Sequence, residues 1–221
     1  MILLHIKMVK IISFDLDGTL TQPDFGDLVW LDGLPKAYAN EKKIPISLAK
    51  KQLIKAYDTI GKTKREWYDL SYWIEKLHLS IKPQDLLNQY KHQIKPYPDA
   101  LSVVANLSKK FTLIISSSAM REFISIELKQ SKLDSYFSFV FSSTSDTNTV
   151  KKNPSFYKMI CSTLNISPEK MIHIGDSKRL DYESPRKNGI TSFYLKRDKQ
   201  SKQQFYVSSL KEFEKKIIEQ H

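Results

Sequence analysis

The chain has 221 residues, of which 41% are hydrophobic and 11% are aromatic. This length fits one large domain or a domain that carries an insertion, and this hydrophobic fraction excludes a chain that is disordered throughout. Six glycines and nine prolines exclude a collagen-like or low-complexity architecture. The single cysteine, Cys161, excludes an internal disulfide and a multi-cysteine metal site, so we expect a reducing, cytoplasmic location.

The formal net charge of +11 raises the question of an anionic partner. A basic surface attracts nucleic acid, anionic membranes and phosphorylated small molecules alike. The basic residues are spread along the chain, and no basic motif with interleaved aromatic residues is present. We therefore expect a small phosphorylated metabolite rather than nucleic acid, and a non-enzymatic basic binding module is the alternative.

The two ends of the chain carry little information. No apolar run approaches the roughly 18 residues of a membrane span, so we expect no membrane segment. Residues 1–7 precede the first strand pattern and are either an extension or an alternative start. Nothing in the sequence indicates the oligomeric state.

Short apolar runs alternate with helical patterns along most of the chain. Continuous apolar runs are typical of strands that are buried on both faces of a parallel sheet. The predicted strands are 9–14, 111–115, 137–141, 171–174 and 191–195, and the predicted helices are 99–109, 120–133, 154–164 and 209–219. This alternation predicts an α/β fold with a doubly wound parallel sheet.

One connection, between the first two predicted strands, is about 100 residues long and so far exceeds an ordinary crossover. Helical spacing appears within it at 48–60, 64–77 and 83–90, and Trp67 and Trp73 are expected in an apolar core there. We therefore predict that residues 23–95 form a helical cap domain, inserted into a core domain made of 8–22 and 96–221. A loop over 20–34 and the cap are expected to set the substrate specificity.

The most informative segment is Asp15-Leu16-Asp17-Gly18-Thr19, directly after the first predicted strand. Side chains at the carboxyl ends of parallel strands open into the crevice where such sheets bind ligands. Two carboxylates this close repel, which raises one pKa unless a cation is present. The segment therefore predicts either a metal site or an acid–base pair, and Gly18 permits the tight turn. A capping turn remains possible, whereas a calcium loop would need further acidic positions that are absent.

Three later segments supply polar groups that suit an anion or a metal ion. In chain order they are Ser116-Ser117 after the second predicted strand, Lys151-Lys152 before a helix start at Asn153-Pro154, and Gly175-Asp176-Ser177 with Asp181 after the fourth strand. Each is weak alone, because serines end many strands and lysine pairs are usually solvated. Together they give an acid, a hydroxyl, a lysine and an acid in order.

This order of motifs resembles the haloacid dehalogenase (HAD) superfamily of aspartate-nucleophile phosphatases and their relatives. The segment 15–19 matches the family's first motif, DxDGT, and 175–181 matches its fourth, GDSxxxD. The second and third motifs are more permissive, and 114–116 and 151–154 resemble them. The likeness spans residues 9–195 and implies a Rossmann-like core with a C1-type helical cap.

The resemblance implies a Mg²⁺-dependent phosphatase that hydrolyses a small phosphorylated metabolite through an aspartyl-phosphate. It implies the catalytic residues Asp15, Asp17, Ser116 and Lys151, and phosphate contacts from Gly18, Thr19 and Ser117. It also implies that Mg²⁺ is bound by Asp15, Asp176 and the backbone carbonyl of Asp17, with support from Ser177 and Asp181. Asp15 would be the nucleophile and Asp17 the general acid and base, which argues against the dehalogenase branch, since that branch lacks this acid. A phosphomutase of the same superfamily is the alternative.

Two departures from the family pattern affect individual residues. The usual Lys-Pro-x-Pro is Lys-Lys-Asn-Pro here, so Lys152 could be the active lysine, although the spacing favours Lys151. Ser117 stands where many relatives carry Asn. His78, His92 and His173 have no zinc-pair spacing and are expected to be satisfied or exposed.

Overall fold

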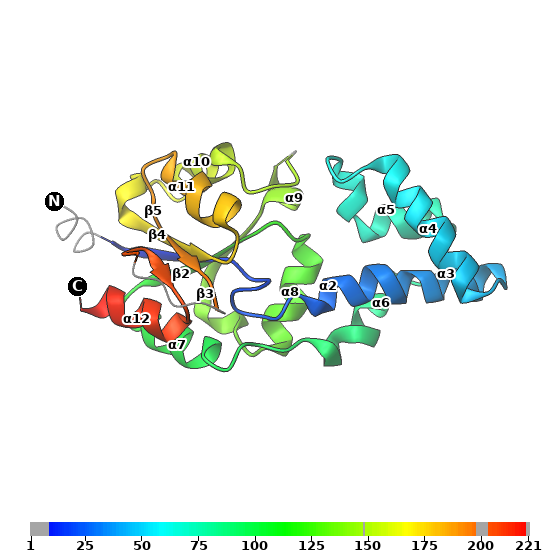
Figure 1. Ribbon diagram of the computed structural model, residues 1–221, viewed down its shortest axis with the longest axis horizontal. Helices are drawn as coiled ribbons and strands as arrows, with labels where there is room; N and C mark the ends of the chain where they lie inside the picture. The colour runs from blue at the N-terminus through cyan, green and yellow to red at the C-terminus, as the bar shows by residue number, and fades with distance from the viewer. Residues whose placement is uncertain (1–8, 148, 198–202, 220–221) are drawn as a thin grey trace.

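The computed structural model describes residues 9–147, 149–197 and 203–219, so the predicted extension at 1–7 lies outside the described residues. All the strands run parallel in one sheet of order β3-β2-β1-β4-β5-β6 (Figure 1). They are β1 (Ile11–Phe14), β2 (Thr112–Ser117), β3 (Phe137–Ser142), β4 (Met171–Gly175), β5 (Thr191–Leu195) and β6 (Tyr206–Val207). The predicted doubly wound α/β fold is confirmed, and only the two-residue β6 was not predicted.

Helices cover both faces of this sheet (Figure 1). On one face lie α7 (Ala100–Leu107), α12 (Leu210–Ile218) and the inner side of α8 (Arg121–Gln130); on the other lie α10 (Pro154–Thr163) and α11 (Ser184–Arg186). Side chains alternate between the faces, so Ile12 and Phe14 of β1 join the first layer and Ile11 joins the second. Burial on both faces explains why these strands are continuous apolar runs.

Helix starts in the core show which capping signals were informative. Ser209 caps α12 by accepting the backbone N–H of Glu212 at 3.1 Å, as its capping-box spacing predicts. Asn153 caps α10 in the same way, accepting from Phe156 N–H at 3.0 Å. Asp99 precedes α7 but does not cap it, because its carboxylate accepts the backbone N–H of Leu210 instead.

Helices also fill the chain between β1 and α7. They are α2 (Asp24–Leu28), a π-helical turn (Val29–Gly33), α3 (Leu34–Lys42), α4 (Ile46–Ile60), 3-10 turns at Arg65–Tyr68 and Lys91–Gln93, α5 (Leu70–Lys76) and α6 (Pro83–Tyr90). The expected loop over 20–34 is therefore wrong from Asp24 onward, because Phe25 and Val29 are buried on one side of a helical path. The single helix expected over 64–77 is two, because Asp69 caps α5 by accepting Tyr72 N–H at 3.1 Å.

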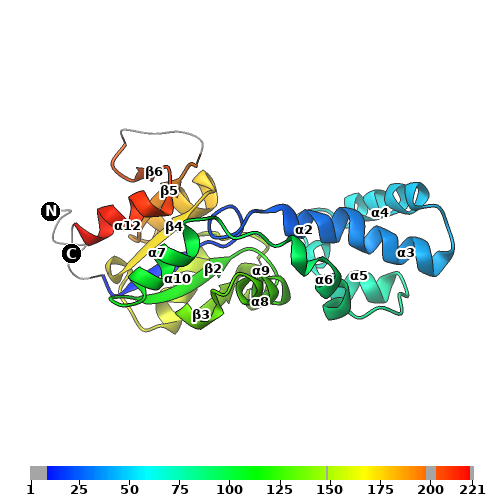
Figure 2. The ribbon, with the colours of Figure 1, turned by 90° about the horizontal axis from the view of Figure 1, so that it is seen from below.

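These inserted helices, called the cap below, enclose an apolar cluster that includes the fully buried Trp73 and, at its edge, the half-buried Trp67. The cluster extends onto the core helix α8, where Phe123 stacks on Trp30 with ring centroids 5.8 Å apart. The predicted domain boundaries at residues 23 and 95 stay a prediction. Figure 2 shows α8 beside the region where the cap meets the core.

The chain enters and leaves the cap through two neighbouring segments. Gln22 N–H donates to Lys95 O, and Tyr97 N–H donates to Leu20 O, both at 2.9 Å. The cap is thus joined to the core by two hydrogen-bonded connections at the carboxyl edge of the sheet. In the ranges the structure describes, no helix combines the length and the apolar character needed to cross a membrane. The cytoplasmic location stays a prediction.

Candidate active site

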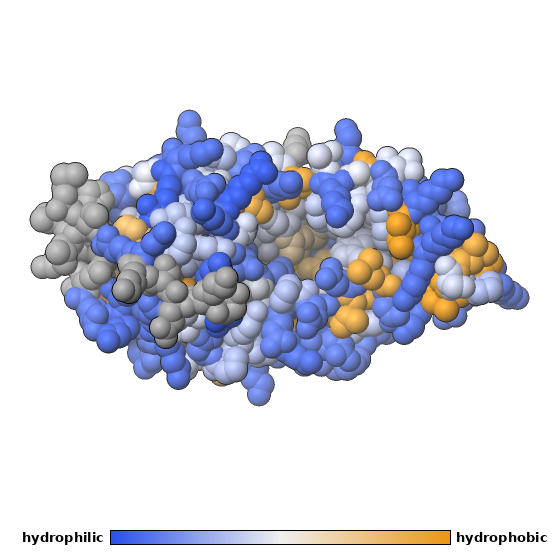
Figure 3. Space-filling model, viewed as in Figure 1, coloured by the Kyte–Doolittle hydropathy of each residue, from blue (hydrophilic) through white to orange (hydrophobic). Residues whose placement is uncertain are grey.

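Strand register brings the predicted site residues to one edge of the sheet. β1 pairs in register with both β2 and β4 as far as Phe14. The next residue on each strand, Asp15, Ser116 and Gly175, therefore lies at the same level, and Asp15 N–H still donates to Ile174 O at 2.9 Å. This edge faces a hollow between the core and the cap, in which hydrophobic side chains are visible (Figure 3).

The turn after Asp15 depends on Gly18, which has a φ of +77°. A Cβ at this position would lie 2.2 Å from Asp176 Oδ2, so a side chain here would displace the Asp176 carboxylate. Gly18 N–H closes the turn by donating to Thr21 O at 2.7 Å. Thr19 is buried, and its hydroxyl donates a long, 3.4 Å hydrogen bond to Asp15 Oδ2. The turn thus brings Thr19 to Asp15 and leaves space for the carboxylate of Asp176.

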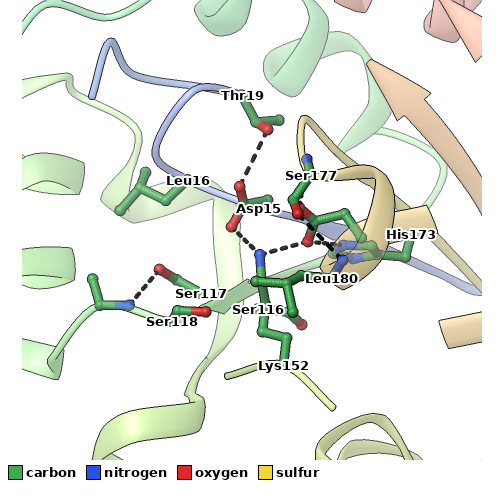
Figure 4. Close-up of polar contacts among 12 residues, drawn as sticks. Asp15, Leu16, Thr19, Ser116, Ser117, Ser118, Lys152, His173, Ser177 and Leu180 are labelled. Atoms are coloured by element: carbon green, nitrogen blue, oxygen red, sulfur yellow. Dashed lines mark hydrogen bonds and ion pairs between the residues drawn. The ribbon is translucent and has the colours of Figure 1, made fainter. Parts of the chain in front are cut away.

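The buried lysine of the site is Lys152 (Figure 4). Its Nζ forms ion pairs with Asp15 Oδ1 and, at 2.5 Å, with Asp181 Oδ1. The prediction that favoured Lys151 for this position is wrong, because the Lys151 side chain is exposed and makes no ion pair with any described residue. Ser184 Oγ donates to Lys152 O at 2.7 Å and fixes the backbone that directs Lys152 inward.

Asp181 is the fixed counter-ion of Lys152. It is fully buried, and its Oδ2 accepts the backbone N–H of Ser177 at 3.0 Å, while its Oδ1 lies 3.0 Å from His173 Nε2. Burial favours the neutral acid, but the charge of Lys152 and the contact with His173 outweigh it and lower the pKa of Asp181 to about 2. Asp181 is therefore charged at neutral pH, and both of its oxygens are engaged.

The pKa values of the other carboxylates of the site are raised rather than lowered. Burial, together with the charges of Asp181 and Asp176, raises the pKa of Asp15 well above its usual value, and Lys152 offsets this only in part. The pKa of Asp176 is raised by partial desolvation of its carboxylate, although the residue as a whole is exposed, and by the charge of Asp181. Burial first, and then Asp176, raise the pKa of Asp17 to about 6 against the pull of Lys152. One buried lysine thus leaves an excess of negative charge.

That excess suits a cation. Single carboxylate oxygens of Asp15, Asp176 and Asp181 all lie within 4.8 Å of one another. Asp181 is engaged by Lys152, His173 and Ser177, and Asp15 Oδ1 is engaged by Lys152. The oxygens most accessible to a cation are therefore Asp15 Oδ2, which has only the long contact with Thr19, and those of the exposed Asp176. An all-oxygen donor set of this kind fits a hard divalent cation such as Mg²⁺. The Asp17 carboxylate is outside the set, so Asp17 could contribute only its backbone carbonyl.

Glu127 is a site residue that the sequence did not reveal. It projects from α8, is buried, and accepts a 2.7 Å hydrogen bond from Thr21 Oγ1. Burial and the neighbouring charge of Asp17 raise the pKa of Glu127 well above its usual value. Its place on the apolar stripe of α8 was the only signal, since a Glu there needs a polar partner in the core.

The hydroxyls after β2 have different environments. Ser116 Oγ lies 2.7 Å from Ser13 Oγ, and Ser117 Oγ accepts the backbone N–H of Ala119 at 3.0 Å (Figure 4). Ser118 Oγ is buried without a hydrogen-bond partner among the described residues. The predicted Ser177 contributes locally: besides its N–H to Asp181, its hydroxyl accepts Leu180 N–H at 3.2 Å.

The chain belongs to the haloacid dehalogenase-like hydrolase family, whose model matches residues 12–195. The position of the inserted helices between β1 and α7 agrees with the C1-cap branch. The protein is therefore a HAD-like hydrolase, and its acidic cluster could bind a divalent metal ion. No curated protein matches the sequence.

Solved structures share this fold at low sequence identity. A HAD phosphatase from Thermococcus onnurineus is 22% identical, with a TM-score of 0.76 over 94% of this chain and 97% of its own. The putative HAD-hydrolase YfnB from Bacillus subtilis, bound to magnesium, is 18% identical, with a TM-score of 0.65 over 95% and 99%. An L-2-haloacid dehalogenase from Xanthobacter autotrophicus is 18% identical, with a TM-score of 0.60 over 94% and 97%. These neighbours include a phosphatase and a dehalogenase, so they establish the fold alone.

Proposed function

We propose that this HAD-like hydrolase is a Mg²⁺-dependent phosphatase that acts on a small phosphorylated metabolite through an aspartyl-phosphate. The observation that carries the proposal is the pair Asp15 and Asp17, in which the pKa of Asp17 is raised to about 6 by burial. The alkoxide leaving group of a phosphate ester needs a proton, whereas a halide does not. An acid available near neutral pH therefore favours phosphoryl transfer over dehalogenation.

In the first step, Asp15 attacks phosphorus and the ester P–O bond breaks. The electron pair of that bond goes to the leaving oxygen, which takes a proton from Asp17. Lys152 touches Asp15 and offsets negative charge on the transferring group as it approaches. Asp181 holds Lys152 in this orientation.

In the second step, water attacks the phosphorus of the aspartyl-phosphate and the bond to Asp15 breaks. Asp17, now deprotonated, accepts the proton of the water and returns to its acid form. Orthophosphate leaves, and the chain is restored with Asp15 as a carboxylate. The cap beside this edge would exclude bulk water during both steps.

Asp15 and Asp176, with the Asp17 backbone carbonyl, would hold Mg²⁺ between them. When bound, Mg²⁺ neutralises repulsion between the nucleophile and the phosphate dianion. The phosphate oxygens would be held by Ser116 and Ser117 and by the turn at Gly18 and Thr19. This assignment is supported by the shared level of Asp15 and Ser116 at the sheet edge.

The test is release of phosphate from p-nitrophenyl phosphate, with halide release from 2-chloropropionate measured in parallel. We expect phosphate release with Mg²⁺, its loss in EDTA and its recovery when Mg²⁺ is restored. Asp15→Asn should abolish turnover while retaining the fold, and Asp58→Asn, on the exposed side of α4, is the matched control. Turnover by Asp15→Asn, activity indifferent to EDTA, or halide release without phosphatase activity would each refute the proposal.

A further inference from the structure

A buried chain of polar side chains links two parts of the site on the α10 face of the sheet. Ser13 of β1, Ser116 of β2 and His173 of β4 are fully buried. Ser13 Oγ lies 2.7 Å from Ser116 Oγ and 2.8 Å from His173 Nδ1. On its other side, His173 Nε2 lies 3.0 Å from Asp181 Oδ1 (Figure 4). Since Asp181 binds Lys152, His173 stands between the hydroxyl and the lysine of the site.

The direction of each hydrogen bond follows from the partners. Asp181 is a carboxylate and can only accept, so His173 donates from Nε2–H. The hydroxyl of Tyr157 supports the same Nε2–H tautomer. It donates to Leu180 O at 2.9 Å, so it accepts from Nε2, which lies 3.1 Å away. Burial lowers the pKa of His173 and keeps the ring neutral, which leaves a lone pair on Nδ1. Ser13 therefore donates to Nδ1, and its oxygen accepts the hydroxyl proton of Ser116 as long as no phosphate oxygen competes for that proton.

We propose that His173 is a positioning residue that acts through both of its ring nitrogens. Nε2–H orients Asp181 and so Lys152, and Nδ1 orients Ser13 and so Ser116. The inference rests on the proposed function, in which Lys152 acts on the transferring group and Ser116 holds phosphate. His173 itself touches neither Asp15 nor the expected place of the substrate.

The residues around His173 argue against a role in packing alone. The other residues of β4 are apolar or glycine, so an apolar residue at position 173 would serve the sheet without a polar group to satisfy. The buried Ser192 of β5 provides the contrast, since it pairs with His173 in register but connects elsewhere. Its hydroxyl donates to Tyr182 O at 2.7 Å and accepts from Arg186 Nε at 3.0 Å. A polar residue at this level of the sheet therefore does not by itself join the site.

Two substitutions separate the hydrogen bond of Nδ1 from that of Nε2. In His173→Asn the amide can occupy the place of Nδ1 and keep Ser13, whereas in His173→Gln it can reach the place of Nε2 and keep Asp181. We expect His173→Asn to lower kcat about 10- to 100-fold with little change in KM, as is typical when a supporting partner is lost. We expect His173→Gln to keep kcat within about threefold and to raise KM and the inhibition constant of orthophosphate by about tenfold.

Ser13→Ala should reproduce the KM effect of His173→Gln, and Ser192→Ala should leave both constants unchanged. The tautomer has a readout that needs no activity: ¹⁵N-histidine NMR should give a neutral Nε2–H ring for the signal that His173→Gln removes.

Three results would overturn the inference. An Nδ1–H tautomer would reverse the hydrogen bonds, and equal changes of kcat and KM in the Asn and Gln variants would indicate a merely structural role. Both leave the proposed function standing if the wild type is active. A wild type that releases no phosphate would instead refute the proposed function, and the inference with it.

Discussion

Replacing Lys152 should be far more damaging than replacing Lys151, its immediate neighbour. The side chain of Lys152 is 3% exposed and lies between Asp15 and Asp181, which are 7% and 0% exposed. Lys152→Met would leave two buried carboxylates without their cation. Lys151→Met changes the same type of residue one position earlier, where the side chain is exposed, and so controls for the loss of one positive charge.

The size of the effect follows from burial. Removing one partner of a buried ion pair costs about 3–5 kcal/mol, because the other partner stays desolvated. For a protein of this size that loss corresponds to a fall in Tm of about 10 °C. Lys151→Met should stay within about 0.5 kcal/mol, as is usual for surface changes. Turnover of p-nitrophenyl phosphate by Lys152→Met should fall by about 10²- to 10³-fold, as when a donor to developing charge is removed.

The pH dependence of the stability loss in Lys152→Met shows whether that loss is electrostatic. Without Lys152, the folded-state pKa values of Asp15 and Asp181 rise above their unfolded values, so folding takes up protons. Acids shifted in this direction contribute stability that is present below the unfolded pKa and lost as pH rises through the folded pKa. The deficit of Lys152→Met relative to wild type should therefore be small near pH 4 and should grow towards pH 7.5.

Urea unfolding at a series of pH values, with and without Mg²⁺, measures this deficit, and the same preparations give kcat. Equal stability of the two variants at pH 7.5, or a greater loss of turnover in Lys151→Met, would refute the assignment of Lys152. A large deficit that does not change with pH would refute the electrostatic explanation and point to lost packing instead.

Other predictions concern the glycine turn, the metal and the acid. Gly18→Ala should cost about 1–3 kcal/mol more than Gly61→Ala, because both glycines have a positive φ but only the Cβ at Gly18 would meet a neighbour; equal losses in thermal denaturation would contradict the close contact with Asp176. Mg²⁺ at 100 times its Kd should raise Tm at pH 7.5 by about 5–10 °C, and Asp176→Asn should remove that shift. Since the pKa of Asp17 is about 6, kcat/KM for an alkyl phosphate should fall up to about tenfold per pH unit above pH 6. p-Nitrophenyl phosphate, with its better leaving group, should fall less, and identical profiles would exclude Asp17 as the acid.

The gathering of the acids and hydroxyls could be predicted from sequence, because it depends on local signals. Apolar runs mark β1, β2 and β4, and parallel strands end at a common edge, so Asp15, Ser116 and Asp176 had to approach one another. The choice between Lys151 and Lys152 could not be made in this way. Two consecutive residues of a loop point in different directions, and the backbone of Lys152 is fixed by Ser184, 32 positions further along the chain.

Buried polar residues were missed for a related reason. Glu127 lies on the apolar stripe of a helix and His173 within an apolar strand, and their partners come from other elements. Periodicity identifies the face on which a side chain lies, but it does not indicate which polar group it will meet there. The helical path over 24–34 was missed because its two glycines weaken the local propensity, and packing of Phe25 and Val29 outweighs that weakness.

The pKa values of two aspartates of the site, Asp181 and Asp17, are shifted in opposite directions, and this allows them different roles. The charge of Lys152 acts on both Asp181 and Asp17, yet the pKa of Asp181 is lowered to about 2 and that of Asp17 is raised to about 6. Lys152 and His173 contact Asp181 directly, so Asp181 stays charged and fixes the lysine. The same lysine acts on Asp17 only through its charge and does not overcome the burial of Asp17, so Asp17 can carry a proton near neutral pH. Carboxylates with separated pKa values take different roles in catalysis. The pairing of Lys152 with Asp181 therefore leaves Asp17 free to exchange a proton.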